Sequence, residues 1–326
     1  MTRPATRVSI GYVGLGVMGE AMVRRLVGTG FRITVYNRTR PRADSLACDS
    51  VVVAASPAEA ARDVDVVLLS LADEQAVDAI LFGSEGVARG LRPNAVVVDT
   101  STVAPAYAQA AEARLARFGV RRVEACVLGN PFQAQAGELR LFTSGAPRDV
   151  DDVRFVLDAL AKDIVYVGPA GKAATMKLVF NALLGAQLVS LAEAITYGVG
   201  AGLDREHLIA AIASSGFSSK VMSFRAAFMQ SARYEPAAFR TRLMEKDLRR
   251  AIQEAGRVGI EMPVVAVAAR RFSKATEAGR ADLDAAAILV QQEDDRGGIE
   301  RWPGGTGREE QLPVCGQESP NAESGR

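Results

Sequence analysis

The sequence is poor in the residues that hydrolases and metalloenzymes use most, with one histidine and three cysteines in 326 residues. A Ser-His-Asp hydrolase needs a histidine beside its nucleophile, and a zinc site usually needs several ligands. The single histidine, His207, lies in an amphipathic stretch, where an ordinary surface or core residue is expected. We therefore expect no metal site, and we expect acid–base chemistry to depend on Lys, Asp, Glu or Tyr.

The cysteines and the net charge narrow the class of protein further. Cys48, Cys126 and Cys315 lie far apart and match neither a disulfide framework nor a metal-binding spacing, so we expect a cytoplasmic protein. No apolar secretory core precedes Arg7. The 39 basic and 38 acidic residues give a formal net charge of +1, which does not indicate a nucleic-acid partner.

A long apolar run begins at Ala173 and is interrupted by Lys177, Asn181 and Gln187. It is long enough to cross a bilayer, but these polar residues favour a buried helix of a soluble protein, so we expect no membrane partner. Lys177 is the only charged residue between Ala173 and Ala192, and Asn181 follows it by one helical turn. A helix face in water would carry more charges, so this buried pair needs an explanation.

The first half of the chain alternates short runs rich in Val and Ile with helical patterns, which predicts a parallel sheet covered by helices on both faces. The expected strands are RVSIGYV, FRITVYN, VDVVLLSL, NAVVVDTS, GVRRVEACVLG, ELRLFTSG and KDIVYVG. Only helical patterns follow up to Gln291. We expect an α/β domain over residues 1–168, a helical domain that begins with an interdomain helix over 169–291, and a disordered tail over 292–326.

A glycine turn follows the first expected strand and opens the first expected helix. Gly14, Gly16 and Gly19 match G-x-G-x-x-G, in which the glycines make a tight turn, admit a pyrophosphate and let the helix pack on the strand. A strand–helix turn without a ligand is the alternative, but this context favours dinucleotide binding in a Rossmann, doubly wound sheet. The residues expected to bind the cofactor here are Gly14, Leu15, Gly16, Val17, Met18 and Gly19.

The end of the second strand indicates which dinucleotide is bound. An NAD site usually has an acidic residue here for the ribose 2′-hydroxyl, whereas this chain has Asn37, Arg38 and Thr39. Because an arginine can face a 2′-phosphate, we expect NADP, with NADPH preferred over NADH, and these three residues at the cofactor. The alternative is that Arg38, Arg40 and Arg42 are exposed loop charges.

Four segments together resemble the β-hydroxyacid dehydrogenase family, which contains 3-hydroxyisobutyrate dehydrogenases, tartronate semialdehyde reductases and glyoxylate/succinic semialdehyde reductases. The segments are GYVGLGVMGEAMVRRLVGTGFRITVYNRT, VVVDTSTVAP, GPAGKAATMKLVFN and LMEKDLRRAIQEAGRVGIEMPV. The likeness spans about Val8 to Leu289. It implies an NAD(P)-dependent oxidoreductase that transfers hydride between nicotinamide and a carbonyl/alcohol substrate of the hydroxyacid or semialdehyde type, in a homodimer or homotetramer.

The resemblance explains the buried polar pair, since the family carries a catalytic lysine and an asparagine on its interdomain helix. Lys177 and Asn181 match these two residues. An ammonium can stabilise the negative charge that forms on a reduced carbonyl and can deliver the proton, while the amide can hold the lysine or the substrate. The alternatives are a structural Lys–Asn contact or a lysine that reaches the surface.

The resemblance also implies further contacts with the cofactor and the substrate. Leu71, Thr102 and Lys246 are expected at the cofactor, Lys246 by reaching back from the helical domain. Ser101 is expected beside the substrate. An ordinary surface charge is the alternative for Lys246.

The expected substrate loop, EACVLGNPFQAQAGEL, departs from the family pattern. The substrate residues are expected at Leu128, Gly129 and Asn130, but Leu128 replaces a serine and Asn130 replaces a glycine, while Glu124, Cys126, Ala173 and Phe180 also differ from the pattern. The pocket should therefore be less polar than usual, and the hydride machinery remains. An imine reductase on the same fold and a non-catalytic NADP-binding protein are the alternative functions; Lys177 argues for a carbonyl couple.

Overall fold

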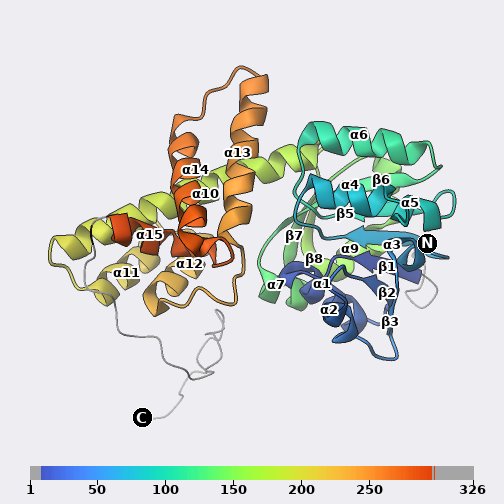
Figure 1. The fold of residues 1–326 in the computed structure, drawn as a ribbon, viewed down its shortest axis with the longest axis horizontal. Helices are drawn as coiled ribbons and strands as arrows, with labels where there is room; N and C mark the ends of the chain where they lie inside the picture. The colour runs from blue at the N-terminus through green and yellow to red at the C-terminus, as the bar shows by residue number, and fades with distance from the viewer. Residues whose placement is uncertain (1–8, 296, 298–326) are drawn as a thin grey trace, which may run out of the picture.

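The computed structural model describes residues 9–295 and 297, and in this part of the chain eight strands form one sheet (Figure 1). Their order is β3-β2-β1-β4-β5-β6-β7-β8, which begins with the strand order of a Rossmann sheet. The strands are β1 (Ser9–Val13), β2 (Arg32–Tyr36), β3 (Val51–Val53), β4 (Val66–Leu69), β5 (Val96–Asp99), β6 (Arg121–Leu128), β7 (Leu139–Ser144) and β8 (Ala161–Tyr166). This confirms the predicted α/β class with a Rossmann sheet.

Two features of the sheet differ from the sequence expectation. Strand β7 runs antiparallel to β6, whereas every other neighbouring pair is parallel. The connection from Leu128 to Leu139 is too short for a parallel crossover, which needs about a dozen residues or more. Strand β3 was not expected, because three residues at a sheet edge carry almost no periodic signal.

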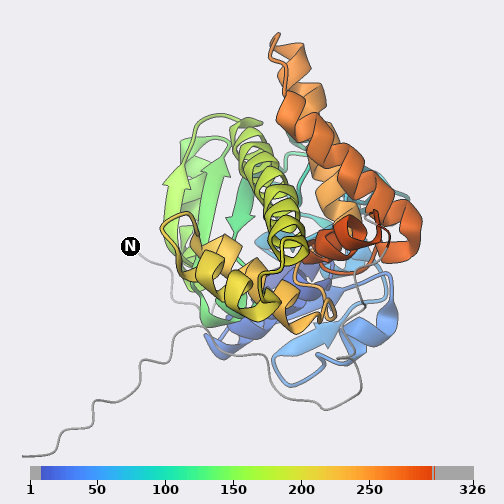
Figure 2. The same cartoon turned by 90° about the vertical axis from the view of Figure 1, so that its left-hand side faces the viewer.

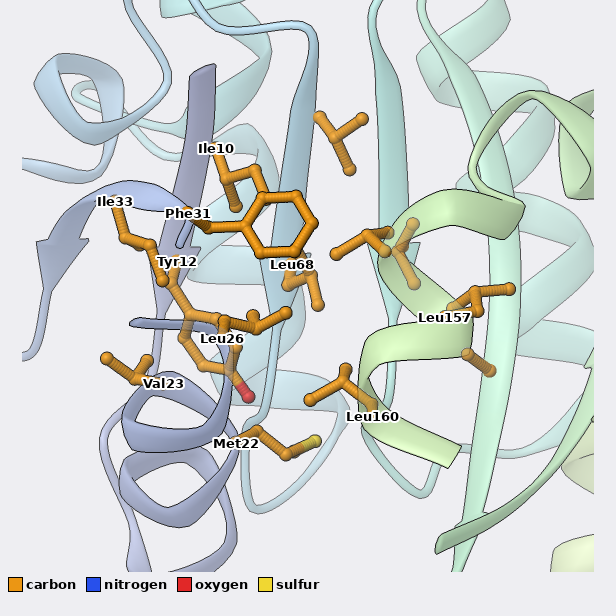
Figure 3. Packing of buried hydrophobic residues seen from close by; sticks show 14 of the residues in the cluster. Ile10, Tyr12, Met22, Val23, Leu26, Phe31, Ile33, Leu68, Leu157 and Leu160 are labelled. Atoms are coloured by element: carbon orange, nitrogen blue, oxygen red, sulfur yellow. The ribbon is translucent and has the colours of Figure 1, made fainter. Parts of the chain in front are cut away.

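Helices cover both faces of the sheet, as the buried, Val-rich strands require. The first face carries α1 (Val17–Gly28), α2 (Arg40–Asp44), α7 (Pro131–Ala136), α8 (Pro147–Asp152) and α9 (Arg154–Leu160). Figure 3 shows this core, where Met22 and Leu26 of α1 and Leu157 and Leu160 of α9 meet Tyr12 and Leu68 of the strands. The second face carries α3 (Pro57–Ala60), α4 (Glu74–Phe82), α5 (Val87–Gly90) and α6 (Pro105–Ala116).

Helix α10 (Lys172–Gly200) crosses from the sheet domain into the helical domain (Figure 1). Ala174 packs in the core of the second sheet face, whereas residues from Leu178 onward pack in the helical core. The helix is long and apolar enough to span a membrane, but half of its most apolar window is buried inside the protein. The buried part of its apolar surface is therefore accounted for by two cores that share one helix.

The helical domain packs against the second half of α10. Its elements are α11 (Arg205–Ser214), α12 (Lys220–Ser231), α13 (Thr241–Arg257), α14 (Pro263–Ala275) and α15 (Ile288–Asp295). Helices α13 and α14 form a hairpin that projects beyond the rest of the molecule (Figure 2). The middle of α13 lies toward the sheet domain, where Arg250 forms an ion pair with Glu74 of α4.

Four residues of the expected tail, 292–295, are part of the last helix, because α15 continues to Asp295. The three acidic ones have cationic partners in the body: Glu293 pairs with Arg205, Asp294 with Arg280, and Asp295 with Arg271 and Lys274. Residues 296 and 298–326 of the expected tail lie outside the described residues.

Truncation tests whether the acidic end of α15 contributes to stability. Compared with a chain stopped after Gly297, a chain stopped after Gln292 should lose about 1–2 kcal/mol of unfolding free energy, since partly exposed ion pairs contribute little each but act here as a network. Urea unfolding at low and high salt checks this. Equal stability of the two chains at low salt would show that residues 293–295 contribute nothing.

Candidate active site

The glycine turn leaves an open space in front of α1. Gly14 has φ +98°, and a Cβ there would lie 2.3 Å from the Ser70 carbonyl oxygen. A Cβ on Gly19 would lie 2.0 Å from the Gly14 oxygen, whereas one on Gly16 would meet nothing within 4 Å. No side chain caps α1, whose N-cap is Gly16. The turn therefore fits a pyrophosphate, which would occupy the free space and bind the helix N-terminus.

The residues after β2 divide between holding the turn and facing outward. Asn37 accepts a hydrogen bond from the Leu15 N–H at 2.9 Å and donates one to the Thr39 carbonyl at 2.9 Å. Its amide therefore braces the glycine turn from the position where NAD-binding chains place an acid. Arg38 is exposed, and within residues 9–295 its side chain has neither an ion-pair nor a hydrogen-bond partner. Its guanidinium is thus free to meet an anion.

Lys246 of α13 reaches across to the loops that follow β4 and β5. Its Nζ donates to the Ala72 carbonyl at 2.6 Å and to the Thr102 carbonyl at 3.1 Å. Ser101 links the same two loops, because its Oγ accepts a hydrogen bond from the Leu71 N–H at 2.9 Å. The structure thus brings Ser101, expected at the substrate, together with three residues expected at the cofactor: Leu71, Thr102 and Lys246.

Lys177 projects from α10 toward the end of β6. Its Nζ donates to the Val127 carbonyl at 2.7 Å, and the side chain is half-buried. Val127 lies between Cys126 and Leu128 on the strand, so the ammonium lies beside the expected substrate loop. A cation fixed by one carbonyl retains two further N–H donors for another acceptor.

Asn181 is tied to a different partner from the one expected. The amide donates to Asp247 Oδ2 of α13 at 2.6 Å, so it joins two helices and does not bind Lys177 directly. Asp247 is buried, and its other carboxylate oxygen lies 3.2 Å from Lys246 Nζ. The sequence analysis missed Asp247, although its place between the buried Met244 and Leu248 of one helix face marks it as a core-facing acid.

The wall around the end of β6 is largely apolar. Cys126, Phe142 and Ala173 are buried there, and Leu128 and Phe180 pack against them, with the Phe142 and Phe180 ring centroids 5.2 Å apart. The nearby Asn130 is the N-cap of α7, where its Oδ1 accepts a hydrogen bond from the Gln133 N–H at 3.0 Å.

The substrate loop therefore offers few polar groups. Capping leaves only the amide NH₂ of Asn130 for a ligand. Gly129 has φ +147°, and a Cβ there would lie 2.7 Å from Leu139 Cδ2, so glycine is needed for the backbone course.

A separate hollow of about 650 Å³ lies between α13 and α14 and is lined by none of the expected site residues.

Two protein-family models match the two domains in order. The NAD binding domain of 6-phosphogluconate dehydrogenase matches residues 9–168, and the NAD-binding domain of NADP-dependent 3-hydroxyisobutyrate dehydrogenase matches residues 171–291. The fold and the matches thus define a nicotinamide-dependent oxidoreductase that acts on CH–OH groups.

Individual relatives agree with this class over most of their length. Glyoxylate/succinic semialdehyde reductase 2 of Arabidopsis thaliana is 30% identical over 88% of this chain and 82% of its own. The solved 3-hydroxyisobutyrate dehydrogenase of Mycobacterium tuberculosis with L-serine has a TM-score of 0.76 at 27% identity, over 87% and 98% of the two chains. The chain belongs to the β-hydroxyacid dehydrogenase family.

Two further structures bear on the cofactor and on the alternative function. The structure of Psf3 in complex with NADP+ and 2-OPP has a TM-score of 0.78 at 26% identity, over 86% and 99% of the chains. The imine reductase of Myxococcus stipitatus has a TM-score of 0.56 at 22% identity, over 88% and 99% of the chains, which shows a shared fold alone.

The burial of Cys126 can be tested by alkylation. Burial raises the pKa of the Cys126 thiol to about 12, although Lys177 nearby lowers it. A raised pKa means that the nucleophilic thiolate is scarce below that pH, so iodoacetamide at pH 8 should label the exposed Cys48 and spare Cys126 until the protein unfolds. Peptide mass mapping reads each site, and prompt labelling of Cys126 would contradict the buried placement.

Proposed function

We propose that this enzyme reduces a small carbonyl compound of the semialdehyde or 2-oxo/3-oxo acid type to the hydroxy compound, or catalyses the reverse reaction, with Lys177 as the proton donor or acceptor. The observation that carries the proposal is the placement of Lys177 Nζ at the end of β6, 2.7 Å from the Val127 carbonyl and beside the substrate loop. The relatives named as semialdehyde reductase and 3-hydroxyisobutyrate dehydrogenase support this substrate type.

The nicotinamide cofactor, when bound, supplies or accepts the hydride. The protein's own part is to hold the carbonyl oxygen near an ammonium that stabilises its developing negative charge and then gives it a proton. Asn181 and Asp247 hold α10 against α13, so they keep the lysine-bearing segment in place when the substrate binds.

The preferred cofactor is NADPH. The Asn37 amide is already hydrogen-bonded to Leu15 and Thr39. The exposed Arg38 next to it is free to pair with a 2′-phosphate. The neighbouring structure that contains NADP+ supports this preference. Thr39 and the turn residues Leu15, Val17 and Met18 complete the proposed cofactor site, together with Leu71, Thr102 and Lys246.

The substrate that this site favours carries an apolar group next to its carbonyl. Leu128 supplies no hydroxyl, and the side-chain oxygen of Asn130 already accepts the hydrogen bond that caps α7. Phe142 and Phe180 line the same wall. An imine is the second candidate because the imine reductases share the fold, but an ammonium at Lys177 favours an oxyanion over a cationic iminium.

The enzyme is proposed to act in the cytoplasm as a homodimer or homotetramer, without a membrane or nucleic-acid partner. The exposed face of α10 carries Val179, Leu183 and Tyr197, which are 49%, 58% and 79% exposed. Large apolar side chains exposed on one face of a helix are typical of a surface that a second subunit covers.

The cofactor preference predicts the effect of Arg38→Ala. The loss of one charge-assisted contact should weaken NADPH binding by about 1–3 kcal/mol and leave NADH binding almost unchanged. Dissociation constants from fluorescence titration check this, with Arg32→Ala, an exposed arginine at the opposite end of β2, as the control. A wild type that binds NADH as tightly as NADPH would overturn the preference.

The proposed proton transfer predicts a large effect of Lys177→Ala. Turnover should fall by roughly 10²–10⁴-fold, the usual range for a general acid, while cofactor affinity changes little. Asn181→Ala should cost less, and the double variant should lose less than the product of the two effects, because both residues serve one site. Near-normal turnover of Lys177→Ala on a substrate of the wild type would refute the role of the lysine.

A further inference from the structure

Three charged side chains are buried under the first turn of α10, away from the proposed chemistry. Asp99 at the end of β5 and Arg122 and Glu124 on β6 are 2%, 2% and 4% exposed. Charged residues are rarely buried this far unless they are paired, so the contacts of each one need an account.

Arg122 is the centre of this cluster, because it contacts both carboxylates. Its Nη2 donates to Asp99 Oδ2 at 2.8 Å, and its Nη1 lies 3.3 Å from Glu124 Oε1. Nη1 also donates to the Ala108 carbonyl of α6 at 3.1 Å. The guanidinium therefore bridges β5, β6 and α6 in one plane.

Glu124 connects the cluster to α10. Its two carboxylate oxygens accept hydrogen bonds from the Gly171 N–H at 2.6 Å and the Ala174 N–H at 3.1 Å. A carboxylate at this end of a helix is favoured by the positive end of the helix dipole. Ala174 lies one turn before Lys177, so Glu124 holds the turn from which the lysine projects.

Asp99 connects the cluster to the loops that follow β4 and β5. Its Oδ1 accepts a hydrogen bond from the Ser101 N–H at 2.9 Å, and the Ser101 hydroxyl in turn accepts one from the Leu71 N–H at 2.9 Å. An unbroken series of polar contacts thus runs from Leu71 to the start of α10.

Stability alone does not account for such a cluster. Burying three charges carries a desolvation cost that their attraction only offsets, and well-packed apolar residues often stabilise a fold equally well. Directional contacts do supply one thing that apolar packing does not, namely a fixed distance and angle between the elements that they join.

We propose that Arg122 and Glu124 are positioning residues for the reaction: they fix the first turn of α10, and through it Lys177, relative to the loops at Leu71 and Ser101. This inference rests on the proposed function, since the two residues act through the lysine. Arg122 does so by holding Glu124 in place against Asp99.

A double-mutant cycle separates positioning from a structural role. Arg122→Met and Glu124→Gln should each lower kcat by about 10–100-fold, the cost of a slightly misplaced catalytic group, with a much smaller change in KM. In the Lys177→Ala background the same substitutions should change the residual kcat by less than about 3-fold, because the misplaced group is already absent. Glu124→Asp, which keeps the charge, should recover part of the wild-type rate.

The matched control is Arg121→Met on the same strand. Arg121 pairs with Asp149 and Asp152 on the other side of β6 and has no contact with α10 in the described part of the chain, so its loss should change the melting temperature and leave kcat unchanged. Melting temperature and circular dichroism verify that each variant folds. If Arg122→Met does not fold, Glu124→Gln, which keeps the shape of the side chain, decides the question.

Equal losses of kcat in the Lys177 and Lys177→Ala backgrounds would overturn the inference and show a purely structural cluster. A kcat within about 3-fold of wild type in folded Arg122→Met or Glu124→Gln would also overturn it. Both results leave the proposed function intact if Lys177→Ala itself remains strongly impaired. Normal turnover of Lys177→Ala would instead refute the proposed function, and the positioning role with it.

Discussion

Helix α10 is shared by two hydrophobic cores, and the arrangement of the whole molecule depends on it. Ala174 is packed under the sheet, and Leu178 already belongs to the helical core. Lys177 lies between these two anchors, at the point where the helix leaves one domain for the other. Because interiors are densely packed, neither core can shift along the helix without leaving a void, so the place of the lysine is determined on both sides.

The polar contacts between the domains supplement this shared helix. Lys246 and Arg250 lie one helical turn apart on α13, and both bind the region just beyond β4 and β5. Asp247 lies between them in the sequence, and its carboxylate accepts a hydrogen bond from Asn181 of α10. One short stretch of α13 thus contacts both parts of the expected site: the loops after β4 and β5 in the sheet domain, and Asn181 on α10. The loops that are expected to touch the cofactor are the same ones that Lys246 of α13 contacts.

Local patterns in the sequence were sufficient for the Rossmann sheet, the glycine turn and the lysine on the interdomain helix, because each depends on neighbours in the chain. The antiparallel β7 and the edge strand β3 were not predicted, since strand direction and edge pairing are decided by connection length and by tertiary contacts. Asp247 and Arg122 were missed for a related reason. Each is an ordinary charged residue in the sequence, and only the fold buries it beside a partner that is distant in the chain.

The departures of β6 from the family pattern separate into two kinds once the strand is placed. Glu124 and Leu128 lie on the same face of β6, because side chains alternate along a strand. Glu124 lies under the helix start and is compensated by Arg122, so the exchange of one acid for a longer one is absorbed inside the protein. Leu128 lies at the far end of that face, partly buried in an apolar wall that no polar neighbour compensates. The change at Glu124 preserves the geometry of the helix start, because Arg122 pairs with the new carboxylate. The change at Leu128 leaves the wall apolar, which bears on the ligands that fit there. The second kind is therefore the basis of the apolar substrate preference that we propose, whereas the first kind keeps the start of α10 in place.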